Sequence, residues 1–107
     1  MLNMDYIKET LMTVYEKYSH IRLGIIGSYA NGTATAESDL DILVDGDSIQ
    51  GEIADYIREL FDVPVDVLWL DLLEKEDKRL DQLLLEVISS VNEYSAYKSI
   101  IKEVVWI

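Results

Sequence analysis

The chain has 107 residues, half of them hydrophobic and 28% charged, a composition typical of a folded domain rather than a disordered chain. Its net charge of −12 disfavours direct binding of nucleic acid, because such surfaces need clustered Lys and Arg. Without cysteine, neither a disulfide framework nor a thiolate metal site can form. Nucleotide chemistry remains open, because divalent cations can bridge acidic side chains to phosphates.

The N-terminal sequence lacks the basic start and continuous apolar core of a secretory signal. No stretch approaches the roughly 18 apolar residues that a membrane-spanning helix needs. We therefore expect one cytoplasmic domain over residues 1–107, with no membrane partner.

Residues 4–18 are predicted to form an amphipathic helix, because apolar residues recur along one helical face. Those residues are Met4, Ile7, Leu11, Val14, Tyr15 and Tyr18. Residues 21–26 follow as a short, almost wholly apolar run, which is typical of a buried strand. The turn Gly27-Ser28 comes next, and a short helix would start at about Ser28.

A second strand is expected over residues 39–44, ended by the turn signal at residues 45–47. A second main helix spans the periodic residues 49–60, with Ser48 as its N-cap. A third strand covers residues 63–70, where Pro64 belongs near the strand's start or on an edge strand.

The pattern is helical again from Glu74 to Val91, with more apolar positions than one face needs. Tyr94 to Ile101 allow another short helix, and residues 104–107 favour a final strand or packing tail. The sequence of elements predicts a small α/β domain (α+β), a mixed β-sheet flanked by helices.

The glycine-serine turn is the first candidate binding element. Glycine lets backbone approach a ligand closely and adopts dihedral angles that other residues avoid. A helix starting at Ser28 would direct backbone N–H groups outward as an anion site, and Ser28 adds a hydroxyl donor. By itself, however, Gly-Ser after a strand is more often an ordinary turn.

Asp39 and Asp41 are the second element. Side chains two apart on a strand point to the same face, and two carboxylates there repel each other unless something compensates. The pair can equally be solvent-facing, with the alternate residues Leu40, Ile42 and Val44 forming the buried set.

Asp66 is the third element, because it interrupts an otherwise apolar strand, where a lone charge is costly. If strands two and three are neighbours, Asp66 can join Asp39 and Asp41 on one face. Three carboxylates there would be oxygen ligands for hard cations such as Mg²⁺. A solvent-facing position on an edge strand is the alternative.

Together, Gly27-Ser28, the Asp39-x-Asp41 triplet after ten intervening residues, and Asp66 in a later strand resemble the signature of the polymerase-beta-like nucleotidyltransferase superfamily. In particular, the chain resembles the minimal nucleotidyltransferases of the MNT or MntA type, antitoxins found beside HEPN ribonuclease toxins. The resemblance covers nearly the whole chain.

The resemblance implies a fold and a mechanism. Gly27 and Ser28 would hold the triphosphate of ATP, and Asp39, Asp41 and Asp66 would ligate two Mg²⁺ ions. Asp66 would also help to deprotonate the acceptor hydroxyl that attacks the α-phosphate. Related antitoxins transfer AMP to a tyrosine of the HEPN toxin, so a cognate toxin and a hetero-oligomer with it are the implied partner and assembly.

One residue departs from the family pattern. Many relatives read Gly-Ser-x-Ala-Arg-Gly, whereas this chain has Asn31 where arginine is usual. Asparagine forms hydrogen bonds but supplies no positive charge near the phosphates.

Two other functions stay open at the level of sequence. The acidic surface suits a non-catalytic antitoxin that neutralises a basic toxin by binding alone. A small-molecule nucleotidyltransferase of the aminoglycoside type is the other, although no extra domain for such an acceptor is evident.

Overall fold

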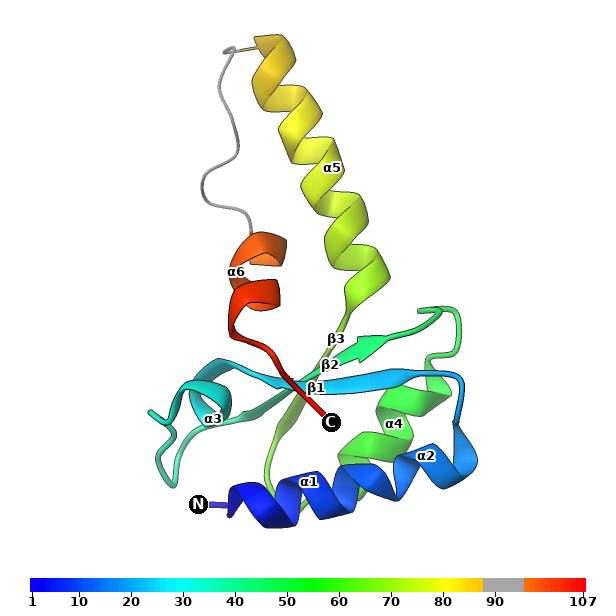
Figure 1. The fold of residues 1–107 in the computed structure, drawn as a ribbon, viewed down its shortest axis with the longest axis vertical. Helices are drawn as coiled ribbons and strands as arrows, with labels where there is room; N and C mark the ends of the chain where they lie inside the picture. Colours follow the sequence, from blue (N-terminus) through cyan, green and yellow to red (C-terminus); the bar gives the residue numbers. More distant parts are fainter. Residues whose placement is uncertain (88–95) are drawn as a thin grey trace.

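The computed structural model describes residues 1–87 and 96–107, and its centre is a four-stranded mixed sheet with strand order β3-β2-β1-β4 (Figure 1). The strands are Arg22–Ile26 (β1), Leu40–Asp45 (β2), Val65–Trp69 (β3) and Val105–Trp106 (β4). β1 is antiparallel to both β2 and β4, whereas β2 and β3 are parallel. The predicted α/β architecture with a mixed sheet is confirmed.

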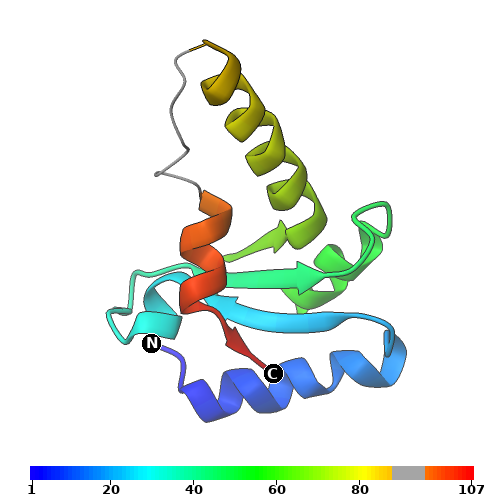
Figure 2. The same cartoon turned by 45° about the horizontal axis from the view of Figure 1, so that its top comes forward.

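Helices cover both faces of this sheet. They are Met4–Met12 (α1), Val14–Lys17 (α2), Gly27–Asn31 (α3), Glu52–Glu59 (α4), Leu70–Val87 (α5) and Ala96–Glu103 (α6). Figure 2 shows α1, α2 and α4 on one face, called here the α1/α4 face. α5 and α6 lie on the other, the α5/α6 face, and α5 projects away from the sheet.

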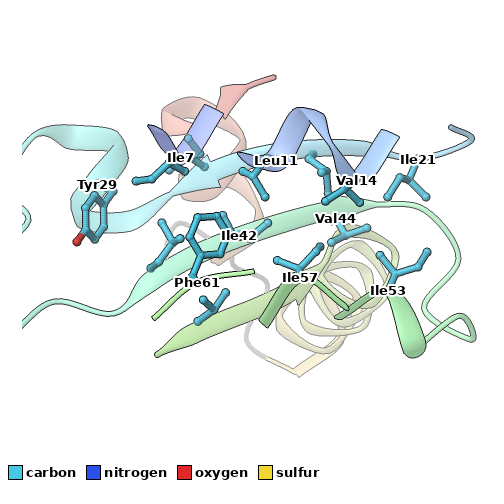
Figure 3. Packing of buried hydrophobic residues seen from close by; sticks show 14 residues of the cluster. Ile7, Leu11, Val14, Ile21, Tyr29, Ile42, Val44, Ile53, Ile57 and Phe61 are labelled. Carbon is cyan, nitrogen blue, oxygen red and sulfur yellow. The ribbon is translucent and has the colours of Figure 1, made fainter. Parts of the chain in front are cut away.

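The larger hydrophobic core lies on the α1/α4 face (Figure 3). Ile7, Leu11 and Val14 from the first two helices pack over β1 and β2, and Ile53 and Ile57 from α4 complete the layer. Alternate residues of β2 enter this core because side chains alternate across a strand. Those residues are Leu40, Ile42 and Val44, all fully buried.

A smaller core lies on the α5/α6 face, where Ile26, Leu43 and Leu70 are buried. Tyr97 and Ile100 of α6 pack against it. β2 is therefore apolar on both faces, except at Asp41 and at its exposed end, Asp45. The register of β2 is set by Asp41, because a slip by one residue would move this carboxylate into the large core on the α1/α4 face.

Replacing Ile42 by alanine is expected to lower the free energy of unfolding by about 2–5 kcal/mol, because a fully buried side chain in a central strand leaves a cavity. Urea denaturation measures this loss. Ile49→Ala is the matched control, because Ile49 is 88% exposed and its removal should change stability by less than about 0.5 kcal/mol. Equal losses in the two variants would contradict this core assignment.

Several boundaries differ from the predicted ones. The first helix is divided at Thr13, whose hydroxyl donates to the carbonyl of Thr10 and competes with regular helix bonding. α4 begins at Glu52 with Gly51 as its N-cap, so the prediction of Ser48 as N-cap was wrong. The backbone N–H of Ser48 instead donates to Asp71 of α5.

Pro64 immediately precedes β3, which is an edge strand, as predicted. α5 begins at Leu70, four residues earlier than expected. Its predicted end at Val91 and the predicted start of the next helix at Tyr94 lie outside the described residues. The expected C-terminal helix and strand are present as α6 and β4. Among the described residues, no helix is both long and apolar enough to span a membrane.

Candidate active site

The register of β2 and β3 places two predicted carboxylates side by side. Asp41 pairs with Asp66 across the parallel strands. Their strand neighbours enter the core on the α1/α4 face, so both aspartates point to the α5/α6 face. Asp41 is partly buried and Asp66 is exposed. Strands two and three are neighbours, so the condition for bringing Asp66 next to Asp41 is met. The catalytic roles of the two residues stay predictions.

Asp39 lies just before β2 and is exposed. It is nevertheless near enough for its charge to act on Asp41. Burial raises the pKa of Asp41, and the negative charges of Asp66 and Asp39, with a side-chain hydrogen bond to Asp66, raise it further. In the folded chain, the Asp41 carboxylate is therefore repelled by the carboxylates of Asp66 and Asp39.

Gly27 closes one side of this carboxylate group. Its φ angle of 70° lies in the left-handed region, and a Cβ added there would collide with Oδ2 of Asp41. The turn thus needs glycine both for its backbone conformation and for the close approach of Asp41. The expectation that this glycine adopts an unusual dihedral angle is confirmed.

α3 begins at Gly27, close to the predicted start at Ser28. Its N-cap, Ile26, has no capping side-chain bond, so the N–H groups of the first turn lack that partner. Ser28 is partly buried at this end of the helix. The turn can therefore present backbone donors beside the carboxylates.

Asn31 ends α3 and is exposed. Its Oδ1 accepts hydrogen bonds from the backbone N–H of Thr33 at 3.1 Å and from the Thr33 hydroxyl. The side chain is thus used to turn the chain after α3.

A cavity of about 430 Å³ opens beside the carboxylates between the sheet and α6. It is lined by Ile26, Gly27, Asp41, Arg58, Asp66, Val67, Leu68, Ser99, Ile100 and Glu103. Sequence reasoning missed Arg58 and the three α6 residues. No motif marks them, and the only signal in the sequence for Arg58 is a basic residue shortly before the strand that carries Asp66.

The carboxylates are the only candidate ligands for the predicted Mg²⁺ that the sequence motif names. Among the side chains that the structure describes, in residues 1–79 and 97–107, no three His, Cys, Asp or Glu are grouped so as to hold a metal ion. Asp41 and Asp66 nevertheless provide two adjacent hard oxygen donors, and burial together with the charges of Asp66 and Asp39 raises the pKa of Asp41. This pair fits a divalent cation, and Asp39, whose charge already acts on Asp41, is available as a further donor.

In metal-free buffer, the Asp41 carboxyl is expected to destabilise the protein as pH rises above about 4. The folded state holds this proton more tightly than the unfolded chain, so the free energy of unfolding falls as pH passes through the raised pKa. Urea denaturation of the wild type and Asp41→Asn across this range measures the effect. The stability of the asparagine variant relative to the wild type should grow with pH, and a difference independent of pH would contradict the expectation.

Comparison with known proteins adds two findings. Residues 7–106 match a family described as the nucleotidyltransferase domain. The protein adenylyltransferase MntA of Thermococcus cleftensis is 33% identical over 78 residues, and the match covers 64% of this chain and 78% of that protein. The family match spans the segment from Gly27 to Asp66, which contains the turn and the three carboxylates.

Proposed function

Since this chain belongs to the nucleotidyltransferase domain family and is an enzyme of the MntA type, we propose that it transfers AMP from ATP to a hydroxyl group of a partner protein. The observation that carries the proposal is the contact between Gly27 and the Asp41 carboxylate, with Asp66 alongside. A turn with outward backbone donors next to paired carboxylates is suited to a metal-bound triphosphate.

Each residue has a separate part in the proposed site. Gly27 and Ser28 bind the triphosphate through backbone N–H groups and the Ser28 hydroxyl. Asp39, Asp41 and Asp66 hold the Mg²⁺ ions, which when bound neutralise charge on the phosphates and the attacking oxygen. The cavity walls position the reacting groups and reduce the access of water.

The proposed reaction is an in-line displacement at phosphorus. The acceptor hydroxyl oxygen forms a bond to the α-phosphorus of ATP while the bond from that phosphorus to the bridging oxygen of the β-phosphate breaks. Pyrophosphate leaves, and AMP remains on the acceptor. Asp66 takes the proton of the hydroxyl, since it is exposed and lies beside Asp41 at the cavity.

The proposed acceptor is a tyrosine of a cognate HEPN-type toxin, with this chain as its antitoxin. The adenylyltransferase name of the Thermococcus cleftensis relative supports a protein acceptor. The net charge of −12 suits a basic partner, with which the chain would form a hetero-oligomer.

The test is to incubate the protein with Mg²⁺, labelled ATP and the product of the adjacent reading frame. Label should reach the partner with the wild type and be absent with the double variant Asp39→Ala/Asp41→Ala. Full neutralisation of the partner by the double variant, with no transfer by the wild type, would instead support an antitoxin that acts by binding its acidic surface to the partner.

Replacing Asn31 by arginine is expected to tighten ATP binding by about tenfold, because a guanidinium adds charge-assisted hydrogen bonds to phosphate. Titration with a fluorescent ATP analogue in Mg²⁺ measures the dissociation constant. Asn31→Ala is the matched control, because it removes the bonds to Thr33 without adding charge. Similar affinities in all three proteins would show that this position does not contact the nucleotide.

A further inference from the structure

Arg58 lines the cavity of the candidate active site, although no sequence motif includes it. It lies in the last turn of α4, and its Nε–H donates to the carbonyl of Val65 at 3.4 Å. Its Nη1 pairs with Asp55 at 3.2 Å. The Val65 contact attaches the guanidinium to the start of β3, next to Asp66.

The strand order places Arg58 and Gly27 on opposite sides of the carboxylates. Gly27 follows β1, Asp41 lies on β2 and Asp66 on β3, which is the edge of the sheet. Arg58 reaches the cavity from beyond that edge, so the carboxylates separate it from the turn. Neighbouring strands are about 4.8 Å apart, so about 10 Å of sheet lies between Gly27 and β3.

Gly27 and Arg58 are the two ends of this row of site residues across the sheet. In-line displacement places a different reactant at each end. In the proposed function, the pyrophosphate that leaves is held by the turn at Gly27, and the α-phosphate lies at the carboxylates. The attacking oxygen must enter opposite the leaving group, because the two are roughly collinear at phosphorus. It therefore enters from the side of β3 and Arg58.

The charge of the cavity wall indicates what enters there. Arg58 is the one basic residue among the described residues that line the cavity, and the charged residues with it are Asp41, Asp66 and Glu103. Its bonds to Val65 and Asp55 use two of the five N–H donors of a guanidinium. The Asp55 pair is weakly held, since the Arg58 and Asp55 side chains are 48% and 78% exposed.

We propose that Arg58 binds the acceptor by pairing with a carboxylate side chain of the acceptor, next to the hydroxyl that is modified. The acceptor is thus an acidic segment around a tyrosine, and the guanidinium exchanges Asp55 for this carboxylate as the acceptor enters. Bidentate pairing with a carboxylate would fix the orientation of the segment beside Asp66. This inference rests on the proposed transfer of AMP to a protein hydroxyl.

The test uses three synthetic tyrosine peptides that differ only next to the tyrosine, where they carry Glu, Gln or Lys. AMP transfer from labelled ATP is measured for the wild type, Arg58→Gln and Arg58→Glu. The wild type should use the Glu peptide at least about tenfold more efficiently than the Gln peptide. Arg58→Gln should lose this preference, and Arg58→Glu should favour the Lys peptide, while the KM for ATP stays unchanged in both.

Arg22→Gln is the matched control for the loss of a positive charge. Arg22 lies at the opposite end of β1 from Gly27, stacked on Trp106 at 4.1 Å. This variant should keep the wild-type preference for the Glu peptide.

Two results would overturn the role of Arg58 while leaving nucleotidyl transfer in place. One is a wild type that uses the Glu and Gln peptides equally. The other is an Arg58→Gln variant that keeps the preference or whose KM for ATP rises, which would place Arg58 on the triphosphate. A wild type that labels neither the peptides nor the partner protein contradicts the proposed function itself, and the inference falls with it.

Discussion

Asp41→Asn is expected to lower the rate of AMP transfer by at least about a thousandfold while making the protein more stable at neutral pH. Asp41 lies between Gly27 and Asp66, so the loss of its charge removes the central ligand of the proposed metal site. The same change removes a charge that is disfavoured by burial and by repulsion from Asp66 and Asp39, the causes that raise the pKa of Asp41. Steady-state transfer assays and thermal melts measure the two effects.

Asp45→Asn is the control, because Asp45 lies on the same strand and is exposed at its other end. It should keep both activity and melting temperature. Mg²⁺ should raise the melting temperature of the wild type and of Asp45→Asn, since a ligand that binds only the folded state stabilises it. A fully active Asp41→Asn, or a Mg²⁺ shift of the same size in this variant, would contradict the proposed metal site.

Gly27→Ala is expected to lower both stability and activity, by about 1–3 kcal/mol and about a hundredfold. The backbone at Gly27 has a positive φ, and the new Cβ would collide with the Asp41 carboxylate. Either the turn or the carboxylate must move, and a displacement of about 1 Å is enough to impair a reaction that depends on alignment.

Gly32→Ala separates the effect of backbone strain from the effect of a collision with the Asp41 carboxylate. Gly32 has a similar φ of 82°, but a Cβ there would meet no atom within 4 Å. This variant should lose a comparable amount of stability and keep its activity. If both variants lose activity equally, backbone strain in α3 rather than contact with Asp41 is responsible, and the tight fit between the turn and the carboxylate has no functional role.

Local sequence patterns predicted the parts of the site that are defined by neighbours along the chain. The apolar run before Gly27 and the alternation around Asp41 are short-range signals for a strand, a turn and a second strand, and β1, α3 and β2 follow them. The pairing of Asp41 with Asp66 needed a further assumption, that β2 and β3 are neighbours, which no local pattern tests and only the sheet order shows.

Three features of the structure depend on contacts between distant or irregular parts of the chain, which the sequence pattern could not indicate. Ser48 is a good N-cap by residue type, but its N–H is taken by Asp71, and α4 starts later. Arg58 reaches the cavity only because α4 packs against the start of β3. The sequence shows Asn31 where arginine is usual, but only the structure shows that its side chain bonds Thr33 at the end of α3. No periodicity or motif in the sequence signals any of these contacts.

The most direct measurement for nucleotidyl transfer compares ATP labelled at the α-phosphate with ATP labelled at the γ-phosphate. Both are supplied with Mg²⁺ to the wild-type protein and the product of the adjacent reading frame. Cleavage between the α- and β-phosphates leaves AMP on the acceptor, so label should appear on the partner from α-labelled ATP only. Label from γ-labelled ATP, or no label from either while the partner is bound, would contradict AMP transfer at the site formed by Gly27, Asp41 and Asp66.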